Sequence, residues 1–250
     1  MMTAFPTLRH GPALAGAGAA LACAATMAGA HGITAEPGAE RAEFDIVSAA
    51  ITTEGRIATF TMGTAGTPGA ARPDPAGGLA GAPVFSYVWP TDIDPSAVGF
   101  APGAGILAFA VTIHPDFDDT PLFDENGSGA LDDDGGAWHS HWVVLGPDDA
   151  CGPGALKVID IPEGETPPVP PTWPGLPLLL DSPGWSPVFA GTAVSVRVPF
   201  ADIGVVEGAR FDGVTAALRV NANIHAPLLC VTDVFDVASG DLSLPGRVNE

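Results

Sequence analysis

Two runs of apolar and aromatic residues, ILAFAVTIH at 106–114 and WHSHWVVL at 138–145, decide the fold of this chain. Their length and their content of β-branched and aromatic residues are typical of strands. Between them lie 23 residues, 115–137, with eight acidic side chains and no basic one. We expect the two runs to pair as antiparallel strands, with the acidic stretch forming a long loop between them.

The same strand pattern recurs along the rest of the chain. It is clearest in VSVRV at 194–198, where the valines alternate with polar residues and would face a core. Further strands are predicted at 44–51, 57–62, 84–89, 214–220 and 228–235. Thr53-Glu54-Gly55 joins the first two of these into a hairpin, and no segment reads as a long amphipathic helix. The pattern predicts an all-β protein, a single antiparallel β-sandwich of jelly-roll type with long loops, over residues 31–250.

One segment is too rich in proline for a central strand or a helix. Residues 162–187 contain nine prolines, and proline lacks the backbone N–H that both structures need. We expect this segment to be an extended surface loop.

The charge balance limits the partners. The chain has 29 Asp and Glu against 9 Lys and Arg, a formal net charge of -20. Such a chain has no basic patch for phosphates, so we expect neither nucleic acid nor an anionic membrane surface as a partner. Divalent cations are the partners that this charge favours.

The N-terminus is typical of a secretory signal peptide. Residues 1–30 contain Arg9, no acid, and an Ala/Gly/Leu stretch that ends in Ala28-Gly29-Ala30, so cleavage is predicted after Ala30 and the location is periplasmic or secreted. A retained membrane helix and a lipoprotein processed at Cys23 are the alternatives. Removal of Cys23 leaves Cys151 and Cys230, which we expect to form a disulfide in an oxidising compartment.

A calcium loop is predicted within the acidic stretch, because residues 124–132 resemble the calcium loop of EF-hand and dockerin proteins. The resemblance implies these ligands: Asp124, Asn126, Ser128, the carbonyl of Ala130, and Asp132. Gly135 stands where the family has a bidentate Glu. Asp133 or Asp134 would then supply the missing carboxylate, or Asp116, Asp118 and Asp119 would fold back onto the ion. The alternative is a solvated acidic loop without an ion.

A second metal site is predicted from three histidines. His139 and His141 are at i and i+2 of a strand, hence on one sheet face about 6 to 7 Å apart, with Trp138 and Trp142 facing the core. If 106–114 pairs with 138–145, His114 lies at the same end of the sheet as His139. Three imidazoles are a ligand set for zinc or copper. The His-x-His-Trp string resembles the zinc-binding strand of α-class carbonic anhydrases in its geometry alone.

Other residues give weaker signals. His225 is a further ligand candidate, and His31, as the mature N-terminus, would chelate copper as in exported monooxygenases that attack polysaccharides. The opening hairpin, with Phe44-Asp45-Ile46, Gly55, Phe60 and Met62, resembles DOMON-type and family 9 carbohydrate-binding-like sandwiches. That resemblance implies haem or sugar binding, with Met62 as a candidate haem ligand; the alternative for Met62 is a core thioether.

The leading hypothesis is an exported, non-enzymatic protein that binds calcium in its acidic loop and a transition metal at His114, His139 and His141. A zinc or copper metalloenzyme that uses the histidines is the rival, and it requires an open coordination position. A haem- or carbohydrate-binding module is the third possibility.

Overall fold

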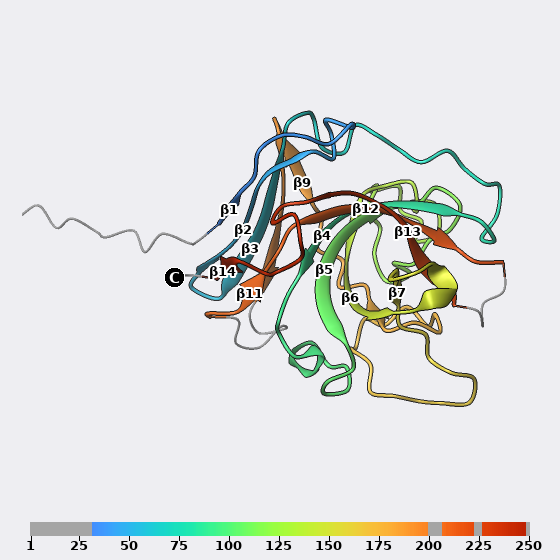
Figure 1. Cartoon of the computed structure of the whole chain (residues 1–250). Coiled ribbons are helices and arrows are strands. Elements are labelled where there is room, and N and C mark those ends of the chain that lie inside the picture. Colours follow the sequence, from blue (N-terminus) through green and yellow to red (C-terminus); the bar gives the residue numbers. More distant parts are fainter. Residues whose placement is uncertain (1–31, 200–206, 223–226, 249–250) are drawn as a thin grey trace, which may run out of the picture.

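The computed structural model describes residues 32–199, 207–222 and 227–248, and every strand pairing in them is antiparallel (Figure 1). The all-β prediction is therefore confirmed. Each predicted run coincides with a strand: β2 (Ile46–Glu54), β3 (Ile57–Thr64), β4 (Pro83–Pro90), β5 (Ile106–Ile113), β6 (His139–Pro147), β10 (Ala193–Pro199), β12 (Val214–Val220) and β13 (Leu229–Val237). The predicted hairpin turn lies between β2 and β3, where Gly55 has a φ of 59°.

Six strands form a closed ring rather than one layer of a sandwich. Its order is β4, β5, β6, β7 (Leu156–Val158), β13 and β12, and β12 pairs again with β4. The ring closes because β5 pairs with β4 along one edge and with β6 along the other. The prediction of a sandwich was wrong in this respect. Alternation shows which side chains face inward, but not whether that face meets a second sheet or curls round on itself.

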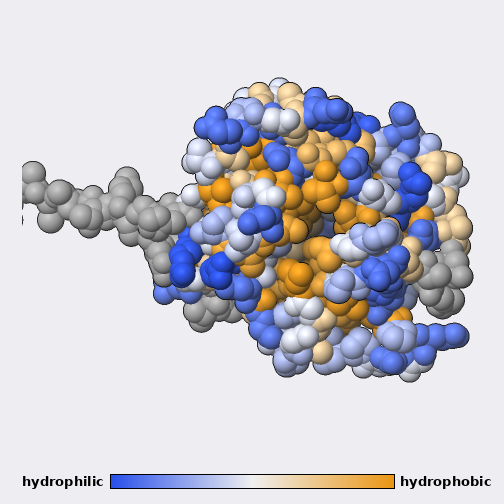
Figure 2. Space-filling model, in the orientation of Figure 1, coloured by the Kyte–Doolittle hydropathy of each residue, from blue (hydrophilic) through white to orange (hydrophobic). Residues whose placement is uncertain are grey.

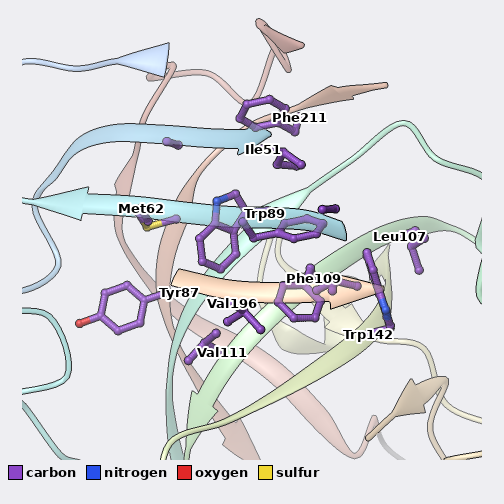
Figure 3. Packing of buried hydrophobic residues seen from close by; sticks show 14 of the residues in the cluster. Ile51, Met62, Tyr87, Trp89, Leu107, Phe109, Val111, Trp142, Val196 and Phe211 are labelled. Atoms are coloured by element: carbon purple, nitrogen blue, oxygen red, sulfur yellow. The ribbon is translucent and has the colours of Figure 1, made fainter. Parts of the chain in front are cut away.

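A second sheet packs against the outside of this barrel. Its strand order is β1 (Ile33–Thr34), β2, β3, β10 and β9 (Val188–Ala190). The layer between sheet and barrel is a large aromatic cluster that includes Phe60, Met62, Trp89, Phe109 and Trp142, all almost fully buried (Figure 3). Met62, the haem-ligand candidate, is thus a core thioether among aromatic rings. Burial on both faces explains why β5 and β6 are nearly continuous apolar runs.

The alternation along β6 assigns opposite faces to its aromatic and imidazole side chains. Trp142 and Val144 belong to the cluster under the second sheet, whereas Val143 and Leu145 belong to the apolar interior of the barrel. His139 and His141 share the parity of Val143 and therefore face the interior. The tryptophan is a core anchor, as expected.

The proline-rich segment 162–187 is not a surface loop throughout. Residues 178–182 are buried, and β8 (Leu180–Asp181) pairs with β6 through Trp142↔Asp181 and Val143↔Leu180. Proline is absent from these five residues, so their N–H groups are free to pair. This buried piece brings Ser182 next to the strand that carries the histidines.

Short elements complete the described chain: η1 (Pro95–Ala97), η2 (Asp149–Cys151), β11 (Arg210–Phe211) and β14 (Gly246–Arg247). Cys151 and Cys230 form the predicted disulfide, with Cα atoms 5.4 Å apart. Nowhere in the described residues is there a helix that meets the length and apolarity required to cross a membrane. The predictions for residues 1–30, Cys23, His31 and His225 lie outside the described residues.

Candidate metal centre

The hairpin of β5 and β6 brings three imidazoles to one end of the barrel. In its register Thr112 lies opposite His139 and Ala110 lies opposite His141. His114 follows Ile113, the last residue of β5, and has the same parity as Thr112. All three histidines are 1% exposed. The two strands thus place the three predicted transition-metal ligands side by side, inside the barrel.

A fourth donor, Asp119, comes from the acidic loop. Asp118 accepts hydrogen bonds from Thr120 N at 2.8 Å and from Thr120 Oγ1 at 2.9 Å, which forms a tight turn. Asp119 lies within this turn and points inward, with 5% exposure. From the sequence, Asp119 is predicted only as an optional calcium ligand. Its signal was the proximity to His114 along the chain, but eight acids share the loop and sequence alone does not rank them.

The four donor atoms lie close together around Asp119 Oδ1. The Nε2 atoms of His114 and His139 are 2.9 Å apart. Asp119 Oδ1 lies 3.1 Å from each of these atoms and 3.3 Å from His141 Nε2, and all four donors lie within 4.8 Å of one another. A zinc ion with bonds of about 2.0 to 2.1 Å sets tetrahedral ligands about 3.3 Å apart. The separations of 2.9 to 3.3 Å are close to that value.

Hydrogen bonds on the far side of each ring fix the tautomers. His114 Nδ1 is 2.9 Å from the carbonyl oxygen of Phe117, and His139 Nδ1 is 2.9 Å from that of Ala137. A carbonyl only accepts, so both Nδ1 atoms carry hydrogen. His141 Nδ1 lies 3.1 Å from Ser182 Oγ, whose own hydrogen is donated to the Asp119 carbonyl at 2.6 Å. Nδ1 of each ring is thus occupied, and Nε2 of each ring faces Asp119 Oδ1.

The atoms that face one another at this point are buried and have few other hydrogen-bond partners. The Thr112 hydroxyl, 3.1 Å from His139 Nε2, is one. Asp119 Oδ1 and His141 Nε2 make no hydrogen bond within the described part of the chain. Burial alone would raise the pKa of Asp119, but attraction to His141 and His114 holds that pKa well below the usual carboxylate range. A buried carboxylate needs positive charge beside it, which protonated imidazoles or a metal ion at the centre of the four donors supply.

Gly135 packs against the Phe117 segment that holds the His114 ring in place. The Phe117 ring stacks on the His114 ring with centroids 3.9 Å apart, and the Phe117 carbonyl is the acceptor for His114 Nδ1. Gly135 packs so closely on that carbonyl that a Cβ atom there would lie 2.0 Å from the oxygen. This contact explains why position 12 of the calcium-like loop is Gly135: no side chain fits there.

The calcium-like residues occupy the exposed part of the loop. Asp124 accepts from Ser128 N at 3.0 Å and from Gly129 N at 2.7 Å, which closes a turn in which Gly129 has a φ of 89°. Asp133 Oδ1 lies 2.9 Å from both Asn126 Nδ2 and Ser128 Oγ. Ala130 and Asp132 lie further along this turn, and Asp132 is exposed.

Asp134, one of the two candidates for the missing carboxylate, lies against Glu125 at the start of that stretch. It is 2% exposed and accepts from Glu125 N at 2.6 Å. Burial and the neighbouring Asp134 carboxylate raise the pKa of Glu125 to about 7. Asp116 accepts from Ala76 N and Gly77 N and so ties the loop to another segment. Glu125 and Asp134 thus lie together and Asp116 bonds elsewhere, so the loop acids do not all converge on one point.

In the described ranges, one group of His, Cys, Asp or Glu side chains brings its donor atoms close enough together to hold a metal ion. Its members are His114, Asp119, His139 and His141. No family model matches the chain, and neither a curated protein nor a solved structure shows detectable similarity to it.

Proposed function

We propose that the protein binds one zinc ion per chain at His114, Asp119, His139 and His141. The observation that carries this proposal is the set of three imidazole Nε2 atoms and one carboxylate oxygen that face one another in a buried site. A set of three nitrogens and one oxygen suits zinc in a four-coordinate site, whereas copper(II) prefers a square-planar or tetragonal set.

Four protein ligands make this a closed, structural type of site. Two ligands are on β6, one follows β5 and one is in the acidic loop. A bound ion would therefore tie the loop to the barrel end, and its charge would compensate the buried Asp119 carboxylate. Its expected role is to stabilise the fold of an exported protein, because closed sites of this type contribute folding energy directly.

The test is elemental analysis of the purified full chain, with thermal unfolding before and after chelation. We expect one zinc per chain and a loss of roughly 10 °C in Tm on chelation, since binding at a thousand times Kd contributes about 4 kcal/mol. The double variant His139→Gln/His141→Gln should lose the metal. Ser140→Ala is the matched control, because Ser140 lies between them but bonds the Trp185 carbonyl instead. A metal-free wild type that rebinds no zinc would refute the proposal.

A metalloenzyme is the second candidate, favoured by one observation: His114, Asp119 and His141 also line the cavity inside the barrel. An incoming molecule could then reach the ion if Asp119 left its coordination position. Cobalt substitution distinguishes the two cases. A spectrum unchanged by azide indicates a closed site, whereas a new ligand-field spectrum indicates an open one.

Calcium binding in the acidic loop is a separate proposal. It is supported by the turn at Asp124 and by the approach of Asp133 to Asn126 and Ser128. Calorimetric titration of chelator-treated protein with millimolar CaCl2 tests it. Heat that disappears in Asp124→Asn but persists in Asp116→Asn, a loop acid that bonds the backbone at Ala76 and Gly77, is the expected result. No heat in the wild type would refute it.

Export to an oxidising compartment is supported by the disulfide between Cys151 and Cys230 and by the signal-like residues 1–30. N-terminal sequencing of the mature protein tests the proposed cleavage after Ala30. A mature chain that still begins at Met1 would contradict it.

A further inference from the structure

The barrel encloses a cavity of about 480 Å³ that the proposed metal site does not account for. Its walls come from all six strands of the ring and are built almost entirely of aliphatic side chains, among them Val84, Val143, Val158, Leu218 and Leu229. Volumes of 300 to 1,000 Å³ are typical of small-molecule sites. One end of the cavity reaches His114, Asp119 and His141.

Small side chains at one level of the barrel create the space. Ser86 lies opposite Thr112 on β5 and opposite Ala216 on β12, and Ala110 lies opposite Val88 one step away. Ser86, Ala110, Thr112 and Ala216 all line the cavity. Barrels of this size are usually filled by their own side chains. Here the row of small residues leaves the centre open, beside the histidines.

The polar groups of the cavity wall are already satisfied by the protein. Ser86 Oγ donates to the Ala216 carbonyl at 3.0 Å, and Thr112 Oγ1 contacts His139 Nε2. The remaining polar side chains of the lining are the proposed metal ligands at one end and Thr91, Asp92 and Asp94 at the other. An occupant therefore finds little to hydrogen-bond with, and a cavity lined by Val, Leu and Ala favours hydrocarbon over water.

The opposite end of the cavity has an exposed apolar rim. Ile106, Val234 and Leu242 line it and are 40%, 48% and 43% exposed. Leu242 and Leu244 have φ values of 58° and 53°, which are rare for such side chains and mark strain of the kind found at ligand sites. Hydrophobic residues gather around a hollow in the space-filling view, over the ring of strands seen in Figure 1 (Figure 2).

Charge at the rim selects against anions. Asp92 and Asp94 line the same end, where Arg210, bonded to the carbonyls of Ser243 and Leu244, is the nearby cation among the described contacts. The rim is thus net negative, and the whole chain carries a formal charge of -20. A carboxylate or sulfonate would be repelled there and would lose its hydration in the aliphatic interior. The rim thus disfavours fatty-acid anions, and uncharged molecules are the expected ligands.

We propose that the barrel binds an uncharged, largely hydrocarbon small molecule, which enters past Ile106, Val234 and Leu242 and lies against Ser86, Ala110 and Ala216. The geometry of the cavity carries this inference by itself, so the inference stands whether or not the histidine site holds zinc.

The experiment compares two probes with one aromatic skeleton. N-phenyl-1-naphthylamine is uncharged, and 1-anilinonaphthalene-8-sulfonate is its sulfonated analogue. Titration of the full chain, with and without added zinc, should show saturable 1:1 binding of the neutral probe, and binding of the anionic probe at least tenfold weaker. Equal or stronger binding of the sulfonate would overturn the charge argument. No saturable binding of the neutral probe would overturn the proposal.

Filling the cavity tests the location. Ala110→Leu and Ala216→Leu each add bulk at the open level, and each should weaken binding of the neutral probe at least tenfold. Ala190→Leu on the exposed strand β9 adds the same bulk outside and should leave binding unchanged. Far-ultraviolet circular dichroism and Tm verify folding of each variant. If one of the two cavity-filling variants fails to fold, the other still tests the location. Wild-type affinity in both folded filling variants would overturn the assignment.

Discussion

The imidazole of His141 and the hydroxyl of Ser182 contact each other through Nδ1 and Oγ at 3.1 Å, although they are 41 residues apart in the chain. The same hydroxyl donates to the Asp119 carbonyl at 2.6 Å. One serine thus orients two proposed ligands. Ser182→Ala should weaken zinc binding by roughly 10- to 100-fold, the usual cost of losing such a supporting partner. Competition with a chromophoric chelator measures this, and unchanged affinity would show that Ser182 does not orient the ligands.

Adjacent glycines in the acidic loop should respond very differently to the same substitution. In Gly135→Ala the new Cβ would lie 2.0 Å from the Phe117 oxygen, whereas in Gly136→Ala it meets nothing within 4 Å. The first variant must displace the carbonyl that holds His114, so we expect at least a tenfold loss of zinc affinity and a lower Tm. The second should stay within roughly 0.5 kcal/mol of wild type. Similar behaviour of both variants would contradict the role given to Gly135.

The single tyrosine of the chain, Tyr87, should titrate late. Burial raises its pKa from 10.0 to about 12, while the hydrogen bond from Gly69 N opposes that shift. The folded state therefore holds the phenol proton more tightly than the unfolded chain. The stability this provides is complete below about pH 10 and is lost as the pH rises toward 12. Ultraviolet difference spectra of the phenolate should show a midpoint near 12 in buffer and near 10 in urea.

Tyr87→Phe is the control for that titration. Lys157 also has a raised pKa, because Asp148 and Asp160 hold its charged form against the opposing effect of burial. It loses its stabilising contribution in a similar range of pH. The difference in unfolding free energy between wild type and variant isolates the tyrosine, and a pH-independent difference from 9 to 12 would be inconsistent with the shift.

The disulfide should be a large contributor to stability. It joins Cys151 and Cys230 across a separation of 79 residues and links η2 to β13. Closing a loop of this length stabilises a fold by about 4 kcal/mol on the chain-entropy model. Cys151→Ser/Cys230→Ser should lower the unfolding free energy in urea by roughly that amount. Two thiols open to alkylation in the native protein would show that the bond does not form.

The strands and the meeting of three imidazoles were predictable from sequence because both depend on short-range periodicity. A period of two fixes which face His139 and His141 share, and a single hairpin then brings His114 to them. The cysteine pairing followed from having two cysteines after residue 30. The strand faces and the hairpin depend on neighbours along the chain, and each of the two cysteines had a single candidate partner.

The identity of the fourth ligand was not predictable in this way. Asp116, Asp118 and Asp119 lie within four positions of one another, yet one bonds the backbone at residues 76 and 77, one closes a turn and one faces the histidines. Their roles depend on which part of the structure each side chain meets after the loop folds, and the residue type is the same in all three.

The sequence by itself determined the strands, their faces and the excess of carboxylates over cationic side chains. Only the tertiary structure decided that the sheet closes into a barrel, that Ser182 supports His141 from a distant segment, and that small residues on three strands leave a cavity. The physical reason is the distance along the chain over which each kind of interaction acts. Periodicity and turn chemistry act over a few residues, whereas barrel closure, buried hydrogen bonds and empty volume arise from contacts between segments that are remote in the chain.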